Sequence, residues 1–346
     1  MKVWLPSVRS QSGSDVFVER LAELLSSAGC EVQISWFPLR YELFPWLLRS
    51  VRPPAGTEVI HANSWNAFAF AGHQLPLVVT VHHCVRHLGY PAWKGRLQSV
   101  YHDRWIGAFE ERSFAASSAI LAGSNSAGAE VAREFGLQGE IQTIDYWLDT
   151  NKYLPAAGAA PDMRPRVLWV GNMSARKGAD LLPAFRNELD PSIELNIVAG
   201  RRAQSAGLER MGGGVKVWPR LSEPELIDLY RSCDVVVSLS RHEGFGYTAL
   251  EAMACGRPVV AFDVTGLRDV VQHDVTGELC RVEDLEAVAA ACEGLIRNSD
   301  LATKMGMAGR ARAVEKFASE KAAAGYLDVY RRVTDSYAAK NRKDRI

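Results

Sequence analysis

Two glutamates stand eight positions apart in the stretch RHEGFGYTALEAMACGRPVV, which covers residues 241–260. Glu243 lies in a polar segment broken by glycines, and Glu251 lies in a run of small apolar residues that predicts a helix. A buried carboxylate is costly unless a cation or a hydrogen-bond donor meets it. We therefore expect both carboxylates to bind a partner. The hydroxyls of a sugar or of a ribose diol could donate hydrogen bonds to them.

A second set of candidate residues consists of cations that follow predicted strands. Arg176 and Lys177 come after the strand RVLWVG and just before a helix predicted to start near Ala179. Arg201 and Arg202 follow the strand ELNIVAG. Cations beside the free amides of a helix start form a strong anion site. Together with the two carboxylates, these cations suit a phosphorylated sugar or a nucleotide sugar.

The first half of the chain places polar residues at its own predicted strand ends. Gly13 lies in a small polar loop before a helix, where backbone amides could approach a phosphate or a sugar. His82 and His83 follow the strand PLVVTV, and His61, at another strand end, is equally open to a structural role. The run HHCVRH, residues 82–87, lacks regular spacing and a second ligand cluster, so it does not predict a zinc site.

Strand-like and helix-like segments alternate along both halves of the chain, which is typical of parallel sheets covered by helices on both faces. Residues 153–165 are rich in Pro, Gly and Ala and predict a linker. We predict an α/β protein with two Rossmann-like, doubly wound domains facing a central cleft, at 1–152 and 166–317. A final helix at about 318–338 would pack back on the first domain. Ligands of such sheets bind beyond the carboxyl ends of the strands, which puts the site in the cleft.

Composition excludes several classes of protein. The 346 residues suit two domains, and the 40 basic residues balance the 40 acidic ones, which argues against duplex nucleic acid as the main partner. No window of the sequence is apolar enough for a transmembrane helix, and the start lacks the apolar run of a signal peptide. The six scattered cysteines indicate reduced thiols. A cytoplasmic protein is therefore expected.

The order and spacing of several segments resemble the family 4 retaining glycosyltransferases, also described as glycosyl transferases group 1, which have the GT-B fold. The resemblance covers nearly the whole chain and is most specific from Leu221 to Cys280. The matching segments are GSDVFVERLAELL, TVHH, IDYWLDTNKYLP, WVGNMSARKGADLL and LSEPELIDLYRSCDVVVSLSRHEGFGYTALEAMACGRPVVAFDVTGLRDVVQHDVTGELC, followed by the final helix.

The resemblance implies a role for each matching residue. Glu251 would hold the ribose hydroxyls of a nucleotide sugar, and Glu243 would lie by the donor sugar. Arg176 and Lys177 would neutralise the departing diphosphate. His82 would contact the sugar near the reacting carbon.

The same resemblance assigns backbone contacts to the nucleotide sugar. Amides of Gly244, Phe245 and Gly246 would contact the sugar and phosphate, and Gly13 would approach the phosphate from the first domain. Arg201, at its strand end, is added to this set as a cation that binds the nucleotide sugar.

Two departures from the family pattern stand out. Many members have Gly-Arg where this chain has Gly171-Asn172, so one phosphate-binding cation is missing or is supplied by Arg176. The usual Pro-Asn-Gly-Val-Asp run is replaced by DYWLD at 145–149. The sequence assigns no role to Tyr146 and Trp147 beyond shaping the acceptor side of the cleft.

The resemblance implies transfer of a sugar from a UDP or GDP sugar to a glycan or lipid-linked acceptor, in bacterial surface polysaccharide or glycolipid synthesis. No Asp-x-Asp motif is present, so neither a metal nor a tightly bound cofactor is expected. Two other classes stay open: a nucleotide-sugar epimerase or sugar phosphorylase on the same fold, and a non-catalytic subunit that binds a sugar nucleotide.

Two segments, 36–52 and 86–104, mix aromatic residues with arginines. One interpretation is a core helix with solvated arginines. The other is a surface that brings the protein to an anionic membrane, and so places it peripherally on the inner face of the cell membrane.

Overall fold

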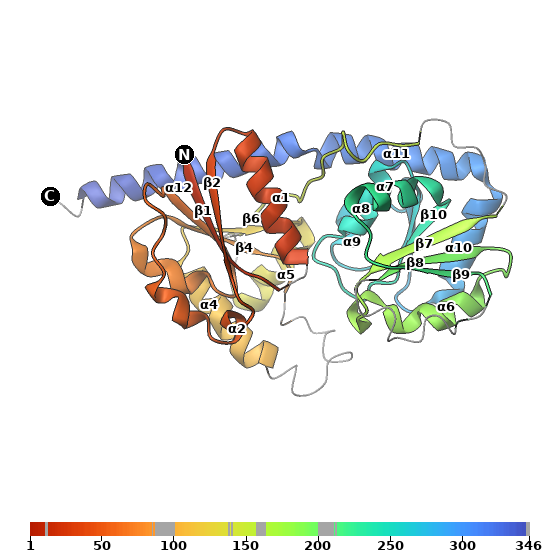
Figure 1. Cartoon of the computed structure of the whole chain (residues 1–346), viewed down its shortest axis with the longest axis horizontal. Helices are drawn as coiled ribbons and strands as arrows, with labels where there is room; N and C mark the ends of the chain where they lie inside the picture. The colour runs from red at the N-terminus through yellow and green to blue at the C-terminus, as the bar shows by residue number, and fades with distance from the viewer. Residues whose placement is uncertain are drawn as a thin grey trace. The chain divides into compact units, whose positions relative to one another are not determined.

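The computed structural model describes residues 1–10, 13–84, 86, 101–137, 139, 141–156, 164–199, 211 and 213–343 (Figure 1). The chain forms two compact units, Met1–Tyr146 with Ser319–Ile346, and Trp147–Ala318. The sequence predicts the first boundary at residue 152 instead. Each unit holds a parallel sheet that has six strands among the described residues. The predicted α/β architecture of two Rossmann-like domains is confirmed.

The sheet of the first unit has the strand order β2-β1-β3-β4-β5-β6. Its strands are β1 (Lys2–Val8), β2 (Glu31–Phe37), β3 (Val59–Asn63), β4 (Leu77–Val81), β5 (Ala119–Ala122) and β6 (Ile141–Thr143). Its helices are α1 (Gly13–Ser27), α2 (Arg40–Leu43), η1 (Pro45–Ser50), η2 (Ala67–His73), η4 (Tyr101–Ile106), α4 (Gly107–Ala116), α5 (Asn125–Phe135) and α12 (Ser319–Lys343). Strand β4, LVVTV, is buried along its whole length, as expected for a parallel strand covered on both faces.

The final helix α12 belongs to the first unit, and a buried histidine connects it to the sheet. His61 of β3 bonds through Nδ1 to the Tyr330 hydroxyl of α12 at 2.6 Å, and through Nε2 to the Thr80 hydroxyl of β4 at 2.7 Å. Burial, with a smaller contribution from nearby His82, lowers the pKa of His61 to about 3. His61 is therefore neutral and structural, and both of its ring nitrogens are occupied.

The sheet of the second unit has the strand order β12-β11-β10-β7-β8-β9. Its strands are β7 (Arg166–Gly171), β8 (Glu194–Ala199), β9 (Val215–Trp218), β10 (Val235–Ser238), β11 (Val259–Phe262) and β12 (Gly277–Cys280). Its helices are η5 (Ala175–Lys177), η6 (Ala179–Leu181), α6 (Leu182–Glu188), α7 (Glu223–Ser232), α8 (Tyr247–Ala254), α9 (Leu267–Val270), α10 (Leu285–Arg297) and α11 (Ser299–Phe317).

Strands β7 and β10 are neighbours in the second sheet although they are far apart in the sequence. Val235, Val236 and Val237 of β10 pair in parallel with the residues from Val167 to Trp169 of β7. Parallel strands end at the same edge of a sheet, so the loops after β7 and β10 emerge side by side. These are the two loops that carry the cations and Glu243.

Candidate active site

The loop between β10 and α8 carries Glu243 and has a tightly constrained backbone. Its residues from Arg241 to Gly246 are buried. Gly246 has φ of 107° just before α8 begins, a conformation that favours glycine. Gly266, with φ of 81°, lies against the same loop. A Cβ on Gly266 would fall 2.6 Å from the Glu243 carbonyl oxygen, so glycine is needed for this close approach.

The loop after β7 carries Arg176 and Lys177 inside the short 3-10 helix η5. The sequence predicts a helix near Ala179; the chain makes η5 and η6 there, and α6 begins only at Leu182. The hydroxyl of Ser174 caps η5 by accepting a hydrogen bond from the Lys177 amide at 3.4 Å. The two cations are therefore held by a capped turn and do not precede the start of a long helix.

Glycine at 178 lets the two loops meet. Gly178 ends η5 with φ of 71°, and a Cβ there would lie 2.1 Å from the Leu239 carbonyl oxygen. Next to this contact, the amide of Arg241 donates to the Arg176 carbonyl at 2.8 Å. The backbones of the two loops are thus packed directly on each other.

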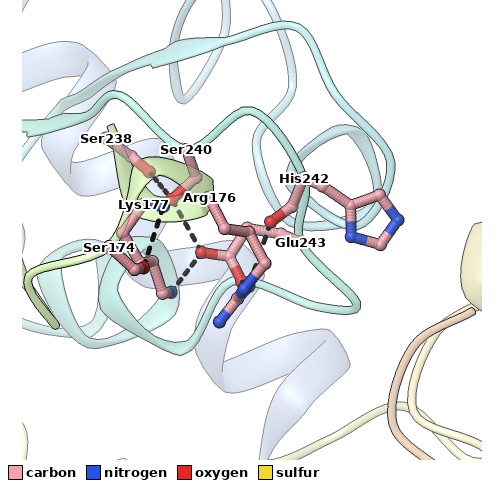
Figure 2. A network of polar contacts seen from close by, with 7 residues as sticks. All are labelled: Ser174, Arg176, Lys177, Ser238, Ser240, His242 and Glu243. Atoms are coloured by element: carbon pink, nitrogen blue, oxygen red, sulfur yellow. Dashed lines mark hydrogen bonds and ion pairs between the residues drawn. The ribbon is translucent and has the colours of Figure 1, made fainter. Parts of the chain in front are cut away.

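The side chains of these loops converge on the carboxylate of Glu243 (Figure 2). Lys177 Nζ donates to Oε1, which also accepts from the Ser240 hydroxyl at 2.8 Å. Arg176 Nη1 lies 3.4 Å from Oε2 and donates to the carbonyl of His242 at 3.1 Å. The structure therefore brings together three residues that the sequence predicted, as one ion network in the second unit.

Charge and burial act in opposite directions on this network. Burial works to raise the pKa of Glu243, but the Lys177 ammonium and the Arg176 guanidinium outweigh it and lower that pKa to about 2. Burial also lowers the pKa of Lys177. The Glu243 carboxylate works to raise that pKa and the Arg176 guanidinium to lower it, and the net shift is downward. Glu243 has two cations beside it, whereas Lys177 has the cation Arg176 as well as the carboxylates of Glu243 and Glu251 near it. Glu243 is consequently ionised at neutral pH.

Arg241 supports this network and was given no role by the sequence. Its guanidinium makes a two-pronged pair with Asp180, at 2.7 and 2.9 Å, and its Nε lies 2.5 Å from Glu283. It also donates to the carbonyl of Ala175 at 2.6 Å. The Arg241 side chain is 5% exposed, so one buried guanidinium joins the β7 loop, the β10 loop and the segment before α10. A planar guanidinium suits this multiple pairing.

Glu251 lies on α8 and meets a partner that the sequence did not reveal. It is buried, and its Oε2 accepts a hydrogen bond from the Tyr230 hydroxyl of α7 at 3.0 Å. Tyr230 is fully buried, and burial together with Glu251 raises its pKa well above the usual value. Tyr230 is therefore a permanent hydrogen-bond donor that orients one oxygen of Glu251.

In the first unit, His82 follows β4 and forms a hydrogen bond through Nδ1 to the hydroxyl of Tyr146. Phe17 of α1 packs edge-on against the imidazole, with ring centroids 4.8 Å apart. Burial lowers the pKa of His82 to about 4, so its ring is neutral at neutral pH. Gly123 makes room for Tyr146, because a Cβ at 123 would lie 2.3 Å from the phenol ring. Tyr146, which had no assigned role, thus holds His82 in place.

The other predicted site residues are placed as follows. Gly13 is the first residue of α1, and a Cβ there would meet nothing within 4 Å. Asp15, in the first turn of α1, accepts from the amide and the hydroxyl of Ser10 at 3.1 and 2.8 Å. The Phe245 ring packs against Phe317 at 5.5 Å, so only its backbone could contact a ligand. Arg201 lies outside the described residues.

A cluster that could bind a metal lies apart from these loops in the sequence. In the described part of the chain, His273, Asp274 and Glu278 place ligand atoms within 4.8 Å of one another. His273 Nδ1 already accepts from the Leu279 amide at 3.1 Å. These residues surround the start of β12 and are not part of the network around Glu243.

Comparison with known proteins finds a glycosyltransferase family model for each of the two units. A model described as "Glycosyltransferase Family 4" matches residues 34–152, and one described as "Glycosyl transferases group 1" matches residues 164–298. A D-inositol 3-phosphate glycosyltransferase from Xylanimonas cellulosilytica is 29% identical over 305 residues, which cover 80% of this chain and 72% of that protein.

Two solved structures share the fold along nearly the whole chain. Sucrose-phosphate synthase from Thermosynechococcus elongatus aligns with a TM-score of 0.83 and 22% identity, covering 97% of this chain and 100% of that one. Anabaena Alr3699/HepE in complex with UDP and glucose aligns with a TM-score of 0.73 and 17% identity, covering 98% and 100%. These neighbours share the fold, and because the two family models together match most of its residues, the chain belongs to glycosyltransferase family 4.

Proposed function

We propose that the chain is a retaining glycosyltransferase that moves a sugar from a UDP or GDP sugar to a glycan or lipid-linked acceptor. The observation that carries the proposal is the buried network in which Arg176 and Lys177 converge on Glu243. Support for the donor comes from Alr3699/HepE, which has been solved with UDP and glucose. Support for a sugar-transfer reaction comes from the inositol phosphate glycosyltransferase.

The leaving diphosphate is the group that most needs stabilisation in such a transfer. Negative charge builds up on it as the bond to the sugar breaks, so cations that are already in position contribute most to lowering the barrier. We assign this task to Arg176 and Lys177, which the capped turn and Glu243 hold in place. The amides of Gly244, Phe245 and Gly246, which lead into α8, would add backbone donors.

Glu243 has two successive roles in this proposal. In the structure its carboxylate balances the two cations and keeps them ordered. When a diphosphate takes over those cations, the ionised carboxylate becomes available to accept hydrogen bonds from hydroxyls of the donor sugar. An ionised acceptor makes roughly twice as strong a hydrogen bond as a neutral one.

Glu251 and His82 would contact the rest of the donor. Glu251 would accept from the ribose hydroxyls, with its orientation set by Tyr230. The neutral imidazole of His82, if it accepts from Tyr146 at Nδ1, carries its proton on Nε2 and can donate to a sugar oxygen. Gly13, and Arg201 as a further cation, complete the set that would bind the nucleotide sugar.

Retention of configuration is proposed from the resemblance to the retaining glycosyltransferases. Because Glu243 and Glu251 are committed to cations and hydroxyls, we propose same-face attack and not a covalent intermediate on either glutamate. The acceptor would attack from the face that the diphosphate leaves, and a diphosphate oxygen would take its proton. The anomeric configuration of the product, measured by NMR on the initial product, decides this point. An inverted product would refute the retaining mechanism.

The proposed reaction uses no metal ion and no tightly bound cofactor. The sequence lacks an Asp-x-Asp motif, and the two protein cations on Glu243 would neutralise the diphosphate in place of a metal. Turnover should therefore survive EDTA without loss. We place the reaction in the cytoplasm, in the synthesis of a surface polysaccharide or glycolipid.

A thermal-shift screen of UDP, GDP, ADP and their sugars tests the proposed donor. A ligand at 100 times its dissociation constant adds about 2.7 kcal/mol of stability. We expect one diphosphate and its sugars to raise the unfolding temperature, whereas a protein that responds to none of them would not be a nucleotide-sugar transferase. An enzyme should hydrolyse that donor slowly in the absence of an acceptor, and Lys177→Ala should lose this hydrolysis severely. A subunit that only binds the donor would not hydrolyse it.

A further inference from the structure

The first unit carries an exposed apolar surface to which two distant segments contribute. It is formed by α2, η1 and the π-helical turn η4, which come from residues 39–50 and 101–106. We call it the aromatic–arginine surface. Its exposed apolar members, with the exposed fraction of each residue, are Leu39 (55%), Leu43 (47%), Phe44 (44%), Leu47 (55%) and Trp105 (41%).

Direct contacts make these two segments one surface. The indole nitrogen of Trp105 donates to the carbonyl oxygen of Leu43 at 3.1 Å. Trp46 packs edge-on against Trp105 at 5.9 Å and against Phe44 at 5.5 Å between ring centroids. Beneath them, Trp46 also packs against the buried Phe109 at 6.1 Å. Trp105 and Phe44 are therefore packed on an aromatic layer that reaches the core, and Trp105 is also bonded to the backbone of Leu43.

Arginines are interleaved with this apolar surface. Arg49 and Arg112 both lie over the ring of Phe68, at 5.8 and 6.0 Å, and both are exposed. Arg40 and Arg104 are exposed on α2 and η4 themselves.

Fewer carboxylates oppose these arginines. Glu42 on α2 is half-buried, and burial raises its pKa. Asp103 is exposed on η4. Glu111 is paired with Arg86 at 2.7 Å. Among the described residues, the surface therefore combines apolar and aromatic groups with an excess of positive charge.

We propose that the aromatic–arginine surface docks on the face of an anionic lipid bilayer. Aromatic and leucine side chains enter the boundary between headgroups and acyl chains, while guanidinium groups pair with anionic headgroups. Trp105 is suited to this because its N–H is already bonded within the protein, so its ring can leave water without an unpaired donor. A second copy of the chain that docks through the same surface fits less well, since the arginines of the two copies would repel each other.

This docking would be peripheral. Among the helices that the structure describes, none is long and apolar enough to cross a membrane. The proposal goes beyond the transfer reaction and does not depend on it, because vesicle binding can be measured without donor or acceptor.

Flotation of the full chain tests the proposal with vesicles of phosphatidylcholine alone and of phosphatidylcholine with phosphatidylglycerol. We expect flotation with the anionic vesicles only, and less of it as salt rises. The pair Arg49→Ala with Arg112→Ala should lower partitioning by about 25-fold, since each arginine near an anionic surface contributes about fivefold. The pair Leu43→Ser with Leu47→Ser should also lower it.

The matched control removes exposed apolar side chains elsewhere. Met307 and Val314, 54% and 43% exposed on α11, are changed to Ser, which should leave flotation unaltered. Three outcomes overturn the proposal: no flotation with either vesicle, equal flotation with both, or a loss in the control as large as in the surface variants. If the leucine pair fails to fold, the solvent-exposed arginine pair carries the test. A donor-induced thermal shift that persists in these variants shows that the transfer site is intact.

Discussion

At the scale of single residues, the carboxylate of Glu243 organises the candidate site. Two cations, Arg176 and Lys177, and one hydroxyl, that of Ser240, meet it from loops at one edge of the sheet. A buried ion pair is costly unless its geometry and hydrogen bonds are good, and removal of one partner strands the other. The arrangement therefore keeps two cations in position, a state useful for binding a diphosphate.

Replacement of Glu243 by Gln should destabilise the protein in a pH-dependent manner. The folded pKa of about 2 lies below the ordinary value of 4.5, so the charged carboxylate stabilises the fold above about pH 4.5. That contribution, about 3 kcal/mol at most, is lost as the pH falls through 2. Unfolding temperatures of wild type and Glu243→Gln should therefore differ at neutral pH and approach each other in acid. Glu19→Gln, on the exposed side of α1, serves as the control and should change little. A constant gap at every pH would contradict the ion network.

Tyr230→Phe should weaken donor binding through Glu251. The substitution removes the hydrogen bond to Oε2, and hydrogen bonds to charged groups contribute about 1.5–3 kcal/mol. Because this bond is present before the donor binds, only the lost orientation of Glu251 affects binding, and we expect the donor KM to rise by about two- to tenfold, with a smaller change in kcat. Tyr330→Phe, which removes an equally buried hydroxyl from α12, should leave that KM unchanged. Equal effects of both substitutions would mean that Tyr230 acts only on stability.

At the scale of elements, the site depends on two loops that leave neighbouring strands. The strands were predictable from their apolar runs, and the helix α8 from its small apolar residues. The 3-10 turn η5 was not, because its cap by Ser174 and its glycine resemble many other turns. Likewise, the pair Tyr230–Glu251 joins two helices, and the spacing of residues within one helix cannot report a contact with another.

Gly178→Ala should separate the two loops. The added Cβ would meet the carbonyl oxygen of Leu239, and φ is 71°. Gly136, at the end of α5, has φ of 70° but nothing within 4 Å of a Cβ, so Gly136→Ala isolates the cost of the backbone conformation alone. That cost is about 1–2 kcal/mol. Thermal unfolding should show a larger loss for Gly178→Ala, together with weaker donor binding. Equal losses would show that the loops are not tightly packed.

At the scale of the whole molecule, the α/β fold and the family could be predicted from the order of segments. The roles of Arg241 and Tyr146 could not, since each depends on partners from distant parts of its unit. Arg241 reaches Asp180 and Glu283, and Tyr146 reaches His82. Such contacts exist only once the chain has folded. The sequence therefore predicted Glu243, Arg176 and Lys177, and the fold identified the residues that position them.

Acid should destabilise the first unit before the second. Burial lowers the pKa of His61 to about 3 and of His82 to about 4, below the value of about 6.5 in an unfolded chain. The unfolded chain then binds two more protons on these histidines, against the one proton that buried Glu110, with its pKa raised to about 8, holds in the folded unit. The stability of this unit therefore falls as the pH drops below about 6.5. The contribution of Glu243 in the second unit is lost only at lower pH. Calorimetry should show one transition moving first, identified as the one that Tyr330→Phe also lowers. Transitions that move together would contradict this order.

The most direct test of the account is calorimetric titration of UDP, UMP, GDP and GMP into wild type and Lys177→Ala, with folding of the variant checked by thermal unfolding. The account predicts that the wild type binds one diphosphate at least about tenfold more tightly than its monophosphate, because Arg176 and Lys177 meet the second phosphate. In Lys177→Ala that preference should be much reduced, because Arg176 is then the one assigned cation left, while the monophosphate binds as before. A folded variant that keeps the full preference for the diphosphate would contradict the account.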